Sequence, residues 1–255
     1  GCPDAQGNHA NDRNVQTLAA ANLVSEMNYE TWWKSRLTLG QGRDELQIEG
    51  GTTARFDTRQ DQAAWVHEFT LPAGKALAGF EMLRQKVVSD TAFSETKRET
   101  NSAWAALSES WGSYRFEGSI RRDDDDQFGA RDTGAASAGY AWPGAGLFTF
   151  TVGRGFRAPT FFDLYAPPSD FYVPNPQLRP EESLGREIGW RSEPMRGWQL
   201  RLTAFDNRIE DLITYVFPTM QNVRRARIRG VEASVEGRAW GLNWRGSYAS
   251  QDPED

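Results

Sequence analysis

The strongest constraint on the fold of this chain is a period of two in its side chains. In residues 113–121, Tyr114, Phe116 and Ile120 fall on one side of an extended backbone, and charged or hydroxyl side chains fall on the other. Such alternation predicts half-buried β-strands. The pattern recurs and predicts about 12 strands, near residues 15–27, 31–42, 58–71, 75–88, 98–110, 112–122, 132–142, 146–155, 182–194, 197–209, 222–237 and 240–250.

The links between these strands alternate in length. Short links are expected at 72–75, 111–113, 143–146, 193–197 and 239–242, and long links at 43–57, 89–97, 123–131, 156–181 and 210–221. Because every second link of an up-and-down meander lies at the same end of the sheet, one end carries tight turns and the other carries long loops. This asymmetry is typical of antiparallel transmembrane β-barrels. We therefore predict an all-β, antiparallel, up-and-down transmembrane β-barrel.

A soluble β-sandwich or a solenoid would also show alternating side chains. A solenoid carries a fixed repeat of roughly 20–50 residues, which this sequence lacks. Soluble proteins with 25% charged residues seldom contain ten Trp, whereas a barrel can turn aromatic side chains to lipid and charged ones to a wet interior. Phe148, Phe150, Trp244 and Tyr248 are accordingly predicted to face outward. A change of phase at Gly230 predicts a β-bulge there.

Several classes of function do not fit the composition. A net charge of −6 argues against nucleic-acid binding, which requires a basic surface. Cys2 is the single cysteine, so neither an internal disulfide nor a cysteine-based zinc site is expected. Glu210 and Asp211 are adjacent, so on a strand they point to opposite faces and cannot act as an acid–base pair. Without a nucleophile in a recognisable turn, the chain is not expected to be an enzyme.

Three charged segments are expected to be structural. The acidic run Asp123–Asp126 lacks the glycine and glutamate spacing of a calcium loop, so a solvated loop tip is expected. The arginines of GRGFR at 153–157 are expected inside a charged interior or at the strand end, and no nucleotide site is expected because no helix is predicted after them. A polar stripe facing the interior is expected from Arg224, Arg225, Arg227 and Arg229.

Four longer motifs carry a family resemblance. The segments GRGFRAPTFFDLY (153–165), NPQLRPEES (175–183), NRIEDLI (207–213) and ARIRGVEA (226–233) resemble the C-terminal half of TonB-dependent outer-membrane receptors. Within that family, FDTRQDQAAW (56–65), RRDDDDQFG (121–129) and SQDPED (250–255) are most similar to the cobalamin transporters.

The resemblance implies a fold and a location. Such receptors are 22-stranded barrels filled by an N-terminal plug. Residues 1–255 are then expected to be a partial barrel domain of about 12 strands, without the plug and the terminal strands. The resemblance also implies a place in the bacterial outer membrane among its lipids. TonB would bind a short motif on the plug, the TonB box, and drive the uptake of cobalamin or a related corrinoid. Phage or colicins would attach at the loops.

The resemblance also implies site residues. Asp4 and Asp12 lie in a polar loop, offer the oxygen ligands that calcium prefers, and match a calcium loop of the cobalamin transporters. Ala5, Thr53 and Arg55 match or lie nearest to positions that contact the substrate. Two alternatives remain at this point: a siderophore or haem receptor of the same family, and a soluble all-β binding module.

Overall fold

The computed structural model describes residues 13–49, 54–169 and 171–254, and they form one antiparallel sheet of twelve strands. The strands are Arg13–Glu30 (β1), Trp33–Glu49 (β2), Ala54–Leu71 (β3), Gly74–Ser89 (β4), Lys97–Trp111 (β5), Tyr114–Asp125 (β6), Gly129–Trp142 (β7), Gly146–Arg157 (β8), Glu181–Met195 (β9), Trp198–Val216 (β10), Thr219–Ala239 (β11) and Leu242–Glu254 (β12). Each strand pairs with its neighbours in sequence, which confirms the predicted up-and-down fold.

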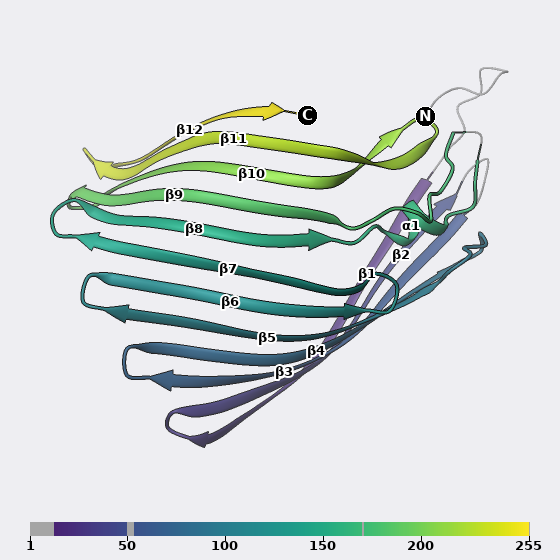
Figure 1. The fold of residues 1–255 in the computed structure, drawn as a ribbon, viewed down its shortest axis with the longest axis horizontal. Helices are drawn as coiled ribbons and strands as arrows, with labels where there is room; N and C mark the ends of the chain where they lie inside the picture. The colour runs from purple at the N-terminus through teal and green to yellow at the C-terminus, as the bar shows by residue number, and fades with distance from the viewer. Residues whose placement is uncertain (1–12, 50–53, 170, 255) are drawn as a thin grey trace.

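A one-turn helix, α1 (Phe161–Tyr165), lies in the link between β8 and β9. Figure 1 shows a curved sheet, and α1 lies at one end of it, where the link between β8 and β9 joins these strands. Side chains of this link pack on one face of the sheet, which we call the inner face, and the opposite face is the outer face. In the described residues, no helix is long and apolar enough to cross a membrane.

The outer face carries a belt of exposed apolar side chains. Strand register places them on the same side of successive strands. The belt includes Leu39, Trp65, Phe80, Leu107, Tyr114, Phe116, Ile120, Phe148, Phe150, Ile188, Leu202, Val231, Trp244 and Tyr248, all exposed. The predicted outward orientation of Phe148, Phe150, Trp244 and Tyr248 is therefore confirmed. A continuous apolar surface of this kind requires an apolar environment, as in the lipid-facing band of a β-barrel.

The inner face is polar at the level of this belt. Glu81 accepts hydrogen bonds from Trp104 Nε1 at 3.0 Å and from Arg121 Nη1 at 2.8 Å. Asp123 accepts hydrogen bonds from Ser102 Oγ at 2.5 Å and from Arg121 Nε at 2.8 Å. The expectation that the acidic run is a solvated loop tip is therefore wrong at Asp123, which is buried in β6 by these partners. It is also wrong at Asp125, which is buried in β6 and accepts a hydrogen bond from Thr100 Oγ1 at 2.7 Å.

The strands extend further into the long links than predicted. Most of 43–57, 123–131 and 210–221 is strand, and β10 and β11 are joined only by Phe217 and Pro218. Beyond the apolar belt the outer face of these strands becomes charged, as at Arg43, Glu45 and Asp57. The pattern that marks the strands in the sequence therefore changes there, while the backbone ladder continues. The pairs Glu45↔Asp57 and Val216↔Thr219 belong to these extensions.

The predicted bulge at Gly230 is also wrong, because β11 keeps its register with β10 and β12 on both sides of this residue. The phase changes in the sequence because Arg227 and Arg229 share the outer face with Val231, where the surface passes from charged to apolar. Gly230 itself lies on the inner face, where a Cβ would come within 2.5 Å of the Phe205 ring. A glycine is therefore required by the packing of that ring.

The basic cluster of β11 faces the opposite way from the expectation. Arg227 donates to Asp206 on β10, with Nε at 2.8 Å and Nη2 at 2.6 Å, and Arg229 pairs with Glu254 on β12. These side chains lie on the outer face beyond the apolar belt, as does Arg225, whose strand partner is Glu210. The predicted interior stripe is therefore corrected for Arg225, Arg227 and Arg229.

Candidate ligand-binding site at the loop end of the sheet

The link between β8 and β9, which we call the 158–180 loop, starts with a capped helical turn. Thr160 Oγ1 accepts a hydrogen bond from Asp163 N at 3.1 Å, and Asp163 Oδ2 accepts one from Thr160 N at 2.9 Å. This reciprocal arrangement is a capping box, which satisfies two backbone donors at the start of a helix. The spacing of Thr160 and Asp163 was the sequence signal for α1, in a segment predicted to be only loop.

The 158–180 loop bridges distant parts of the sheet. At one side, Ser94 N in the β4–β5 link donates to Tyr165 O at 3.4 Å. At the other side, Val173 N donates to Pro218 O at 2.8 Å, and Asn175 Nδ2 donates to Met220 O at 3.0 Å. The loop therefore ties the β4–β5 link to the β10–β11 hairpin across the inner face.

A small apolar core holds this loop down. Leu164 is fully buried, and Leu178 and Ile213 are nearly so. Partly buried side chains surround them: Phe128, Tyr165 and Met220.

Burial is the largest cause that raises the pKa of Tyr172 to about 12, with Asp163 and Tyr215 adding to it. The phenol therefore stays protonated and donates to Phe162 O at 3.2 Å.

Arg98 fixes the start of the loop against β5. Its guanidinium donates to Gln127 Oε1 at 3.1 and 3.0 Å and to Pro159 O at 3.0 Å. Its Cζ atom lies 5.0 Å from the ring centroid of Phe128 and 4.9 Å from that of Phe161, which is cation–π geometry. Arg98 is 7% exposed, so the charge is held between two rings rather than offered to solvent.

The other end of the loop is fixed by Glu181. Its carboxylate accepts from Arg157 Nε at 2.7 Å and Nη2 at 2.6 Å, and from Ile213 N at 2.7 Å. Arg154 pairs with Glu182 at 2.5 Å near the same strand end. The arginines of GRGFR therefore lie at the end of β8, one of the two placements predicted.

A hollow of about 780 Å³ opens between this loop and the inner face of β2–β5. Apolar and aromatic side chains make up most of its lining, with a few polar groups. The lining residues are Leu46, Phe56, Thr58, Gln85, Val87, Phe93, Arg98, Ala158, Pro159, Thr160, Phe161 and Phe162. Hollows with apolar walls and few polar groups are the usual form of a small-molecule site. Sequence analysis did not identify these residues.

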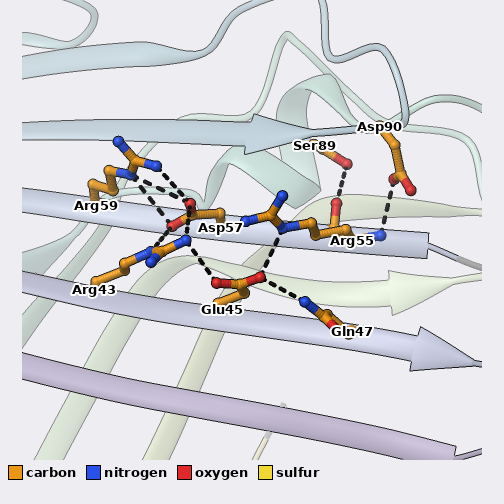
Figure 2. A network of polar contacts seen from close by, with 8 residues as sticks. All are labelled: Arg43, Glu45, Gln47, Arg55, Asp57, Arg59, Ser89 and Asp90. Carbon is orange, nitrogen blue, oxygen red and sulfur yellow. Dashed lines mark hydrogen bonds and ion pairs between the residues drawn. The ribbon is translucent and has the colours of Figure 1, made fainter.

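Arg55 lies on the outer face, away from this hollow. Its Nε donates to Glu45 at 2.7 Å, its N–H donates to Asp90 Oδ1 at 2.9 Å, and its carbonyl accepts from Ser89 Oγ at 2.7 Å (Figure 2). A substrate contact by Arg55 stays a prediction. Asp4, Ala5, Asp12 and Thr53 lie outside the described residues. Within the described part of the chain, no group of three or more acidic, His or Cys side chains is placed to hold a metal.

Asp57 is the centre of the network in Figure 2. It accepts from Arg43 Nε at 3.0 Å and Nη2 at 2.9 Å, and from Arg59 Nη2 at 2.8 Å, and it is 1% exposed. Glu45, the cross-strand partner of Asp57, pairs with Arg43 at 2.6 Å. One carboxylate thus aligns two guanidiniums beyond the apolar belt.

Replacing this carboxylate by an amide is expected to weaken the β2–β3 hairpin. In Asp57→Asn an NH₂ group must face one of the two guanidiniums, and a buried polar group left without a partner costs about 1–3 kcal/mol. Chemical denaturation of the folded protein in detergent measures the loss. Asp61→Asn is the matched control, because Asp61 is exposed on the same strand face and accepts one hydrogen bond, from Gln41 at 2.7 Å. Equal losses in both variants would contradict the role of Asp57.

Comparisons with known proteins agree with this geometry. The family model "TonB dependent receptor-like, beta-barrel" matches residues 3–255. A vitamin B12 transporter BtuB of Vibrio vulnificus is 33% identical over 80% of the chain and 34% of its own length. The BtuB transporter of Photobacterium profundum is 29% identical over 87% of the chain and 38% of its own length. The chain therefore spans about a third of the length of these relatives.

A solved structure gives the same fold. The siderophore receptor PirA from Pseudomonas aeruginosa superposes with a TM-score of 0.83 over 95% of the chain and 51% of its own length, at 14% identity. At this identity the likeness concerns the fold alone. Taken with the family match along almost the whole sequence, the twelve-stranded meander shows that the chain belongs to the TonB dependent receptor-like β-barrel family.

Proposed function

We propose that this chain is part of an outer-membrane, TonB-dependent transporter that takes up cobalamin or a related corrinoid. The observation that carries the proposal is identity to proteins named vitamin B12 transporters, at 33% and 29%. Identity to the siderophore receptor is 14%. Transport on this proposal consists of binding at the loop end followed by gated passage, with no covalent chemistry.

The inner hollow supports this proposal physically. Corrinoids present a broad, largely apolar ring with polar amides at its edge, and they need a wide site with few polar groups. Phe56, Phe93 and Phe162 give such walls, and Thr58 and Gln85 give hydrogen-bonding groups. Arg98 is already held by Gln127 and Pro159, so we assign it to shaping the hollow rather than to binding.

The rest of the machinery is proposed to belong to a longer protein. The relatives are about three times as long as the matched segment, so a plug and further strands are proposed to complete the barrel. TonB would act on the plug, outer-membrane lipid would surround the apolar belt, and phage or colicins would use the loops. Calcium at Asp4 and Asp12, and substrate contacts at Ala5, Thr53 and Arg55, stay part of the proposal.

The alternative within the family is a siderophore or haem receptor. It stays open because a protein named a siderophore receptor, PirA, shares the fold, and the fold alone does not distinguish the two classes of ligand. A soluble binding module is disfavoured by the apolar belt, because Phe80 and Ile120 are 61% and 71% exposed on the outer face.

Uptake by cells tests the proposal. Bacteria without their own cobalamin receptor would be given the gene for the full-length protein and labelled cyanocobalamin. Accumulation that disappears when TonB is deleted, or when the proton gradient is collapsed, is the expected result. Accumulation equal to that of cells carrying an empty vector would contradict the proposed substrate.

A further inference from the structure

Four cations lie in one row across the outer face. Strand register pairs Arg43 on β2 with Arg59 on β3, Arg59 with Lys86 on β4, and Lys86 with Lys97 on β5. Directly paired residues point to the same face, so the four charges are lateral neighbours. With strands about 4.8 Å apart, the row is about 14 Å long.

Such a row is unfavourable without a counter-charge, because like charges directly opposite each other destabilise a sheet. Arg43 and Arg59 are partly compensated by Asp57, which they share. Among the described residues, Lys86 and Lys97 form no ion pair, and both are exposed. The remaining two lysines of the chain, Lys34 and Lys75, both pair with Glu68, at 3.3 and 2.9 Å.

Three acidic groups on the neighbouring rungs of this face are already engaged. Glu99 binds Arg84 at 2.9 Å, and Asp61 accepts from Gln41 at 2.7 Å. Glu45 is held by Arg43 and Arg55 at 2.6 and 2.7 Å. Lys86 and Lys97 therefore have no carboxylate partner within the described part of the chain.

The second arginine of this row, Arg59, is pre-organised to bind an anion. Its hydrogen bonds to Asp57 use Nε and Nη2, which leaves Nη1 free of partners among the described residues. Its side chain is 48% exposed, and Asp57 fixes the plane of its guanidinium. A guanidinium held in this way loses little freedom on binding and matches the oxygens of a phosphate.

The position of the row indicates what the anion is. Lys86 lies on the same strand face as Phe80 and Met82, and about 13 Å beyond Met82 along the strand. A row just outside an apolar belt is at the level of lipid headgroups. The row is longer than a single phosphate group, and its length suits a headgroup that carries two phosphate groups.

We propose that Arg59, Lys86 and Lys97 bind the phosphate groups of a membrane lipid headgroup, at the outer edge of the apolar belt. The inference rests on the membrane location in the proposed function but not on the substrate. It gives this stretch of β3–β5 a fixed lipid neighbour.

Binding of a bisphosphorylated glycolipid tests the inference. Full-length protein in detergent would be titrated with fluorescent lipid A, and with its monophosphorylated form and phosphatidylcholine for comparison. A basic residue near an anionic membrane surface contributes about 1 kcal/mol, so Lys86→Gln with Lys97→Gln is expected to lower the affinity for lipid A about 25-fold. Lys75→Gln, at the other end of β4 and paired with Glu68, should leave it unchanged.

Three results would overturn the inference: unchanged affinity in the double variant, equal binding of phosphatidylcholine, or equal affinity for inorganic phosphate alone. Cyanocobalamin binding by the same samples separates this inference from the proposed function. The double variant is expected to bind cyanocobalamin as the unmodified protein does. Lysine-dependent lipid A binding without cobalamin binding would overturn only the proposed substrate.

Discussion

Phe150→Arg is expected to destabilise the folded protein in a bilayer by about 2–4 kcal/mol, the cost of a cation near the midplane on the lipid face of a barrel. Phe150 is 48% exposed on the outer face, and its strand partners there are Ala138 and Ile188. No acidic side chain is among these partners, so the new charge would face lipid.

Folding of the full-length protein into phospholipid vesicles, followed through a urea titration, measures this cost. Thr151→Arg is the matched control, because Thr151 is the next residue of β8 and points to the polar inner face, where it bonds Ser137 at 3.1 Å. The control should lose no more than that one hydrogen bond, about 1 kcal/mol. If both variants lost the same free energy, the assignment of the two faces would be wrong.

Leu164→Ala is expected to release the 158–180 loop from the sheet. Leu164 is 0% exposed and packs on Leu178 and Ile213, and removing a fully buried leucine costs about 2–5 kcal/mol. Leu164 belongs to the cluster that joins the loop to β10, so most of this loss falls on the docking of the loop rather than on the strand ladder.

Limited proteolysis of the folded protein reports the docking of the loop. Cleavage within 158–180 should become at least tenfold faster in Leu164→Ala, since about 1.4 kcal/mol is a factor of ten. Phe171→Ala is the control, because Phe171 is 75% exposed in the same loop. Equal cleavage rates in the two variants would show that the buried cluster does not hold the loop.

The sheet could be predicted from the sequence because its alternation is strong wherever one face is apolar. Phe148 and Phe150 alternate with Thr149 and Thr151, so the sequence identifies the outer face of β8. Both phenylalanines are exposed in the structure. The same rule failed beyond the belt. There the outer face carries charged side chains, Arg227 and Arg229, in place of apolar ones. Because polar side chains were expected to face the interior, these arginines were assigned to the wrong face.

The candidate site was harder to predict because distant segments form it. Phe161 meets Arg98 and Leu164 meets Ile213 only after the loop has crossed the sheet. The spacing of residues within one segment of the sequence gives no sign of contacts between segments so far apart. The capping pair of Thr160 and Asp163 was a local signal and could have shown where the loop begins to be ordered.

A binding titration gives the sharpest test of the proposed substrate. Full-length protein in detergent would be titrated with cyanocobalamin, a ferric siderophore and haem, with calcium present and after chelation. Saturable binding of cyanocobalamin alone is predicted, and weaker binding after chelation would support the calcium proposal at Asp4 and Asp12. Binding of the siderophore or haem without cyanocobalamin would contradict the proposed substrate and assign the chain to a receptor for that ligand.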